Sequence, residues 1–72
     1  MATDFLIPLS RQLKKDKSPS CRRAIARILS LVTVKFEAGI YDNQMQAERD
    51  FRKLAEAACA RATEARQEIG PQ

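Results

Sequence analysis

Histidine and tryptophan are absent from this 72-residue chain, and glycine occurs only twice. Without histidine, the sequence lacks the commonest general base and the commonest metal ligand. Two glycines are too few for a glycine-rich phosphate loop. The two cysteines are separated by 37 residues, a spacing that matches no zinc motif. We therefore expect no catalytic centre, no bound metal and no cofactor.

Long hydrophobic runs are also missing. A membrane-spanning helix needs about 20 consecutive apolar residues, and every apolar stretch here is interrupted well before that length. The start of the chain shows no secretory signal pattern. We expect a soluble, cytoplasmic protein with reduced cysteines, whose partners are not membranes.

The short length limits how much core the chain can bury. At 72 residues a single core buries only about 60% of the unfolded surface, so we expect marginal stability. Metal ligands are lacking and the cysteines are expected to be reduced, so regular helix packing or self-association has to supply the rest. We expect residues 1–72 to form a single small helical domain.

Hydrophobic periodicity and helix-end residues predict three helices. Ser18 is a good N-cap and Pro19 suits the first helical position, and apolar residues then recur three and four apart as far as Phe36. Gly39 suits the left-handed residue that ends this helix, with Ile40 behind it as the accompanying hydrophobic contact. A capping box is expected to start the last helix, from Asn43 to Gln46. The predicted helices span about residues 8–16, 19–38 and 43–69.

The stretch from Leu31 to Phe36 is prone to form a strand, but no second strand-like run exists to pair with it, so a helix is favoured. The predicted fold class is all-α: a helical hairpin of two long antiparallel helices plus a short N-terminal helix. In such a hairpin, residues equidistant from the bend near position 40 face one another. Cys21 then approaches Cys59. We interpret both as buried thiols, with oxidation to a disulfide as the alternative.

An alanine-rich seam with heptad spacing runs along the last predicted helix. Its second half has no partner in the hairpin, because the mirrored positions would precede Pro19. Only the short first helix or a second copy of the protein can cover it, so we expect a homodimer or higher oligomer. The expected self-association residues are Ala58, Ala62, Ala65 and Ile69.

Charge is unevenly divided along the chain. Residues 1–39 carry eight basic and three acidic residues, a net charge of +5, whereas residues 40–72 carry five basic and six acidic residues, a net charge of −1. The basic residues gather around the predicted start of the second helix, where unsatisfied N–H groups also attract anions. The candidate anion-binding or partner-binding residues are Lys14, Lys15, Lys17, Arg22, Arg23 and Arg27. A solubilising surface is the alternative interpretation.

Tyr41 is a candidate interface anchor, because it is amphipathic and lies near the predicted bend, although packing at the bend is equally expected. The leading functional hypothesis is a non-enzymatic regulator, inhibitor or adaptor that self-associates and binds a partner protein through its helical surface. The rival hypothesis is binding of nucleic acid or another phosphate ligand by the basic first half. The three phenylalanines look like core residues, so no aromatic platform for bases accompanies the charges.

Overall fold

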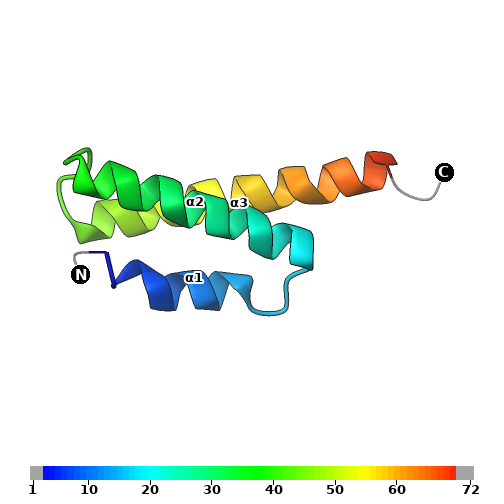
Figure 1. The fold of residues 1–72 in the computed structure, drawn as a ribbon, viewed down its shortest axis with the longest axis horizontal. Coiled ribbons are helices and arrows are strands. Elements are labelled where there is room, and N and C mark those ends of the chain that lie inside the picture. The colour runs from blue at the N-terminus through cyan, green and yellow to red at the C-terminus, as the bar shows by residue number, and fades with distance from the viewer. Residues whose placement is uncertain (1–2, 70–72) are drawn as a thin grey trace.

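The computed structural model describes the backbone of residues 3–69 and the side chains of residues 3–64. Three helices make up the secondary structure of that part of the chain: α1 (Leu6–Lys14), α2 (Pro19–Glu37) and α3 (Gln44–Ile69). α2 and α3 run antiparallel as a hairpin, and α1 lies along one side of it (Figure 1). The predicted all-α fold class is confirmed, and the strand-prone stretch before Phe36 is part of α2.

The limits of α1 differ from the prediction. The helix begins two residues before Pro8 and ends at Lys14, not at residue 16. The amide of Leu6 already donates to the carbonyl oxygen of Thr3 at 3.0 Å, so the chain turns before the proline. Pro8 then occupies the first helical turn, where its missing N–H has no partner to lose. Beyond the helix, Asp16 adopts the left-handed conformation with φ 62°.

The start of α2 is as predicted. Ser18 is the N-cap, and its side-chain oxygen accepts a hydrogen bond from the amide of Cys21 at 3.3 Å. Pro19 occupies the first helical position, where a helix does not need its N–H. The amide of Arg22 donates to the carbonyl oxygen of Ser18 at 2.9 Å, which begins the regular helix.

The end of α2 is a Schellman motif at Gly39, which has φ 79°. The amide of Gly39 donates to the carbonyl oxygen of Phe36, and the amide of Ile40 donates to that of Lys35, both at 3.1 Å. These bonds satisfy two carbonyl groups that the helix end leaves free. The Ile40 side chain is 61% exposed, so it does not supply the buried hydrophobic contact that we expected beside this stop.

A capping box starts α3, as predicted. The Asn43 side chain accepts from the amide of Gln46 at 2.9 Å, and the Gln46 side chain accepts from the amide of Asp42 at 2.6 Å. The reciprocal bond therefore reaches one residue further back than in the usual box. Hydrogen bonds therefore fix the backbone on both sides of the bend, at the end of α2 and at the start of α3. As a result, α3 leaves the bend in a defined direction.

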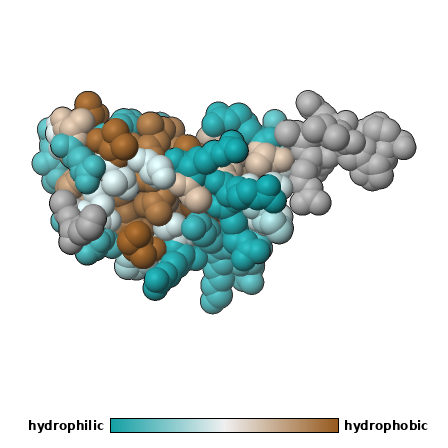
Figure 2. Space-filling view, viewed as in Figure 1, coloured by the Kyte–Doolittle hydropathy of each residue, from teal (hydrophilic) through white to brown (hydrophobic). Residues whose placement is uncertain are grey.

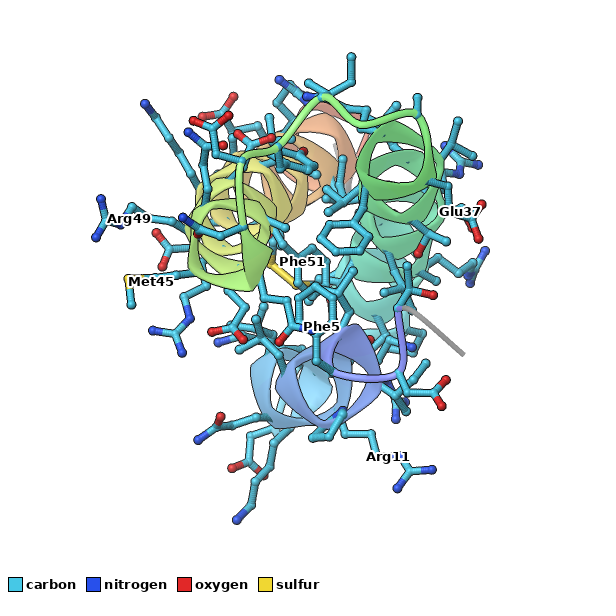
Figure 3. All side chains as sticks on the ribbon, turned by 90° about the vertical axis from the view of Figure 1, so that its left-hand side faces the viewer. Phe5, Arg11, Glu37, Met45, Arg49 and Phe51 are labelled. Atoms are coloured by element: carbon cyan, nitrogen blue, oxygen red, sulfur yellow. A yellow bond between two sulfur atoms is a disulfide. The ribbon has the colours of Figure 1, made fainter. Side chains whose placement is uncertain are left out.

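The hydrophobic core is small and lies where the three helices meet. Its largest fully buried side chains include Phe51 of α3, Leu6 of α1 and Val32 of α2. Phe5 and Phe36 pack edge to face with ring centroids 5.1 Å apart, which joins the start of α1 to the end of α2. Figure 3, a view along the hairpin, shows Phe5 and Phe51 between the helices. Ser10 is also buried, and its hydroxyl oxygen has no hydrogen-bond partner among the described residues.

A disulfide joins Cys21, in the first turn of α2, to Cys59 of α3. The Cα atoms lie 4.5 Å apart, so the proximity predicted from the hairpin register is confirmed. The interpretation of both residues as buried thiols is wrong. Figure 3 shows the yellow sulfur–sulfur bond between the two long helices. The bond closes a loop that contains nearly all of α2, the bend and more than half of α3.

α3 extends well past α2. Its 26 residues span about 40 Å, whereas the 19 residues of α2 span about 30 Å. The disulfide places Cys59 beside the start of α2, so the following backbone as far as Ile69 runs beyond that helix (Figure 1). The predicted overhang is confirmed. In the described part of the chain, no helix combines the length and the apolar character that a membrane crossing requires.

Candidate interaction surfaces

A depression of about 490 Å³ lies between the last turn of α1 and the first turn of α2. Four cations and one carboxylate contribute to its wall, and none of its lining residues is apolar. We call it the basic corner, and its lining residues are Arg11, Gln12, Lys14, Lys15, Asp16 and Arg22. Figure 3 shows Arg11 projecting outward from α1.

Backbone geometry brings the two sides of the basic corner together. Arg11 and Lys14 lie in the last turn of α1, where the helix dipole favours cations. The left-handed Asp16 then redirects the chain toward the start of α2. Arg22 follows the disulfide-bonded Cys21, so a covalent bond to α3 holds the turn that carries this guanidinium.

The structure divides the six cations predicted from the sequence. Lys14, Lys15 and Arg22 share the basic corner, but Lys17 lines a different groove and Arg27 lines a third one. At about 100° per residue, Arg27 lies about 140° around α2 from Arg22, which explains the separation. The six residues therefore surround one end of the molecule and do not form a single patch.

Arg11 was not among the residues predicted from the sequence, although it lines the basic corner. A signal was available, because Arg11 lies three and four residues before Lys14 and Lys15, and residues at these spacings share a helix face. Arg23 is exposed on α2 and lies about 40° from Arg27 on the helix surface. It extends the basic surface away from the depression.

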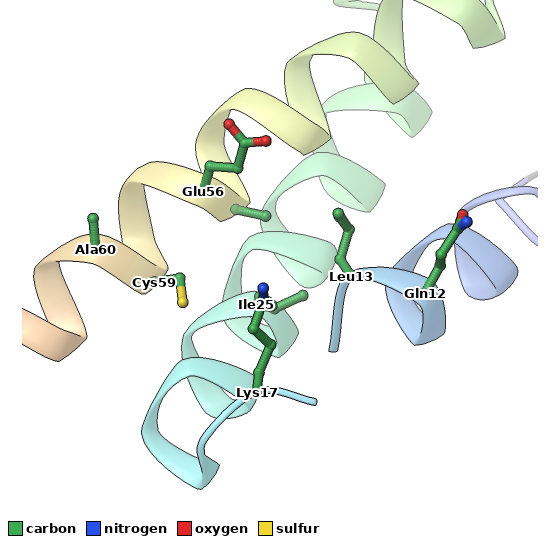
Figure 4. Close-up of a pocket in the computed structure, with 8 residues that line it drawn as sticks. Gln12, Leu13, Lys17, Ile25, Glu56, Cys59 and Ala60 are labelled. Atoms are coloured by element: carbon green, nitrogen blue, oxygen red, sulfur yellow. The ribbon is translucent and has the colours of Figure 1, made fainter. Parts of the chain in front are cut away.

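A mostly apolar groove of about 380 Å³ runs between α1 and α3, beside the disulfide. Figure 4 shows Leu13 on the α1 side and Cys59 on the α3 side. Its ionisable side chains are Lys17 and Glu56, and the disulfide leaves Cys59 without a thiol. The full lining is Gln12, Leu13, Lys17, Ile25, Ala55, Glu56, Cys59 and Ala60.

The side of the hairpin opposite α1 remains uncovered within the described residues. Phe36 contacts Phe5 and so faces α1, whereas Leu31 and Val34 lie about 140–160° around α2 and face away. Their side chains are 47% and 64% exposed. Figure 2 shows hydrophobic atoms gathered over the half of α2 nearest the bend, and hydrophilic atoms over its other half. We call the surface of Leu31 and Val34, together with the adjoining groove between α2 and α3, the open side.

That groove between α2 and α3 has a volume of about 310 Å³. Two of the predicted self-association residues, Ala58 and Ala62, line it, although Ala58 is only 9% exposed. The other two, Ala65 and Ile69, have side chains outside the described residues. The remaining lining residues are Ala24, Arg27, Ile28 and Arg61.

Tyr41 is tied into the bend by polar contacts. Its hydroxyl donates to Oδ2 of Asp50 at 2.5 Å, and Nζ of Lys35 donates to the same oxygen at 3.2 Å. The Lys35 ammonium also lies 5.3 Å from the centre of the Tyr41 ring. These contacts join α2, the bend and α3, so the structure favours the packed interpretation of Tyr41 over that of a free anchor.

The same three groups shift one another's pKa values. The hydrogen bond from Tyr41, followed by that from Lys35, holds the pKa of Asp50 below its usual value despite partial burial. The hydrogen bond to Asp50 is the main cause of a raised pKa for Lys35. Desolvation, followed by the hydrogen bond to Asp50, raises the pKa of Tyr41. At neutral pH the carboxylate and the ammonium are thus charged and the phenol is neutral.

Comparison with known proteins adds no relative to these surfaces. Neither the protein-family models, nor the curated proteins, nor the solved structures compared with this chain gave a match. Any function assigned to this protein therefore rests on the chemistry of its own surfaces.

Proposed function

We propose that this protein is a non-enzymatic interaction module, a small regulator, inhibitor or adaptor, which self-associates and binds a partner protein through its helical surface. The observation that carries the proposal is the open side of the hairpin. α1 covers the opposite side, whereas Leu31 and Val34 keep 47% and 64% of their surface exposed. Exposed neighbouring apolar side chains are typical of interaction sites.

The shape of the open side supports a helix as its occupant. Two antiparallel helices with one uncovered side are completed by a further helix or helix pair, as in helical bundles. A second copy brings the same surface, and two-fold pairing of identical surfaces is the commonest form of oligomer. The overhanging part of α3 adds helical surface beyond the end of α2 (Figure 1).

The ionisable side chains also support a binding role. Lys35 and Tyr41 both donate hydrogen bonds to Asp50, and none of the three lines the basic corner or either of the two grooves. The groove beside the disulfide offers one ammonium and one carboxylate but no nucleophile, since Cys59 is oxidised. General acid and base catalysis requires ionisable groups placed together around a bound substrate, and these surfaces offer few such groups. Their chemistry therefore suits binding better than catalysis.

Self-association is tested by sedimentation velocity over a range of protein concentrations. We expect a mass above that of the monomer, which falls toward it on dilution. Leu31→Glu places a charge on the open side and is expected to weaken the association at least about tenfold, a loss typical of an anchor residue. Val34→Glu is a second variant for the case in which Leu31→Glu unfolds.

The matched control is Ile7→Glu, an equal charge change at an exposed apolar residue on the outer surface of α1. It is expected to keep the mass of the wild type, with circular dichroism reporting helix content for every variant. A wild-type protein that stays monomeric at high concentration contradicts self-association. Equal losses in Leu31→Glu and Ile7→Glu contradict the role of the open side.

A cytoplasmic location remains a prediction. Reduced cysteines were expected in that compartment, and the disulfide weighs against it, because cytosolic reductants normally keep thiols reduced. Neither cysteine belongs to the open side, so the compartment affects the proposed interaction only through the stability that the disulfide gives to the hairpin.

A further inference from the structure

The basic corner combines four cations with a single carboxylate, Asp16, in one depression. Within residues 3–64, no salt bridge or side-chain hydrogen bond engages any of these four cations, whereas Lys35 is paired with Asp50. Like charges around one depression repel one another, and a bound anion relieves that repulsion. The arrangement therefore favours a negatively charged ligand.

We propose that the basic corner binds the phosphate groups of a nucleic-acid backbone without reading the base sequence. The composition of its lining distinguishes this ligand from an acidic protein. Protein interfaces are depleted of charged residues at their core, whereas nucleic-acid interfaces are polar and strongly basic. Every residue of the basic corner is charged or polar. The exposed apolar side chains gather nearer the bend (Figure 2).

The positions of the aromatic residues explain why the contact is with phosphate and not with bases. Stacking on bases requires exposed aromatic rings. Phe51 is fully buried, and Phe5 and Phe36 pack against each other. The single tyrosine, Tyr41, is bonded to Asp50 on the side of the bend. All four aromatic side chains of the chain are therefore engaged elsewhere, which leaves backbone contacts that are sequence-independent and salt-dependent.

The surroundings of the basic corner suit an extended ligand better than a single phosphate. Lys17, Arg23 and Arg27 continue the positive surface around the same end of the molecule, outside the depression. A site for one small phosphate encloses its ligand, whereas a backbone with repeated charges benefits from each further cation along its path. Contacts with about four phosphates predict a log–log dependence of affinity on salt with a slope of about −3 to −4.

The proposal is tested by fluorescence anisotropy with a fluorescein-labelled DNA duplex of about 20 base pairs, between about 25 and 200 mM NaCl. We expect binding with a log–log salt slope of about −3 to −4 and equal affinity for a duplex of scrambled sequence. Absence of binding at the lowest salt, or binding that salt does not weaken, overturns the proposal. Strong preference for one of the two duplexes overturns its sequence-independence.

Paired charge reversals locate the site. Lys15→Glu with Arg22→Glu changes two exposed residues of the basic corner, and Arg49→Glu with Arg52→Glu makes the same charge change at exposed positions of α3. We expect the first pair to lose at least about tenfold more affinity than the second, beyond the general effect of net charge. Equal losses overturn the assignment to the basic corner.

Two further measurements test whether the variants are folded and whether the ligand is a nucleic acid. Circular dichroism melting checks that each variant is folded, and Lys15→Ala with Arg22→Ala replaces the charge reversal if that variant melts early. The alanine double variant is expected to lose at least about fivefold in affinity for the DNA, since two phosphate contacts disappear. Polyglutamate that displaces the DNA at equal charge concentration assigns the basic corner to acidic proteins and overturns the proposal.

Discussion

One carboxylate oxygen of Asp50 accepts hydrogen bonds from both Tyr41 and Lys35. The tyrosine hydroxyl is therefore used within the protein, on the side of the bend where α2 and α3 come together. A free tyrosine at a loop offers both its ring and its hydroxyl to a partner. Here Lys35 also lies over the ring, 5.3 Å from its centre, so a partner has to compete with existing contacts.

The lowered pKa of Asp50 predicts a specific dependence of stability on pH. A carboxyl group whose pKa is lower in the folded protein stabilises the fold above its unfolded value of 3.8, and this contribution is lost as the pH falls through the folded pKa. We expect the melting temperature of Asp50→Asn to fall less than that of the wild type between about pH 4 and pH 2. Because Asp50 and Lys35 are both partly exposed to solvent, we expect this difference to be small.

Thermal melts followed by circular dichroism measure this difference. Asp42→Asn is the matched control, because Asp42 is exposed and its side chain makes no hydrogen bond to Tyr41 or Lys35. It should retain the larger acid sensitivity of the wild type. The same loss of stability in wild type and Asp50→Asn would contradict the role given to the hydrogen bond from Tyr41.

At the scale of the helices, the ends that depend on local chemistry were predictable. Ser18, Gly39 and Asn43 act within a few residues of themselves, so their side chains and backbone preferences identify the ends of α2 and the start of α3. The start of α1 was not predictable in this way. Burial of Leu6 and packing of Phe5 on Phe36 stabilise a turn before the proline, and these contacts come from distant parts of the chain.

The left-handed residue at the end of α2 gives a prediction for backbone strain. Gly39 has φ 79°, and a Cβ added there would meet no atom within 4 Å. Gly39→Ala should therefore lower the free energy of unfolding by about 1 kcal/mol through backbone conformation alone, without a steric clash. Urea unfolding measures the change. Gly39→Asn should lose less, because asparagine tolerates this conformation, and an unchanged midpoint in Gly39→Ala would contradict the prediction.

At the scale of the whole molecule, the disulfide is the largest single constraint on the unfolded chain. It joins residues 38 apart in sequence, and closure of such a loop stabilises a fold by about 4 kcal/mol. We expect Cys21→Ala with Cys59→Ala to lose about that amount in urea unfolding. A loss of this size is comparable with the total stability of a small domain.

Reduction of the wild type provides the control. A dithiol reductant should bring the stability of the wild type close to that of the double variant, while leaving the double variant unchanged. Alanine is chosen in place of serine because Cys21 is only 2% exposed, and burial of the serine hydroxyl would itself lower the stability. A double variant as stable as the oxidised wild type would contradict the estimate.

The candidate sites were predictable only in part, because charge is visible in sequence but its distribution in space is not. The count of basic residues located the charged end of the molecule. It did not reveal that Arg22 and Arg27 point in different directions, or that Arg11 joins the first of them in one depression. The hairpin register correctly predicted that Cys21 lies close to Cys59. The expected reducing compartment then favoured two thiols over the disulfide that the structure contains.

The crosslink also fixes an alignment that the alanines of α3 cannot define alone. Ala55, Ala58 and Ala62 offer similar small side chains at successive turns, so at this end of the hairpin the side chains alone leave α3 more freedom to shift along α2 than the buried Phe51 leaves it nearer the bend. A covalent bond between Cys21 and Cys59 removes that freedom. It thereby fixes the length of α3 that protrudes beyond the start of α2.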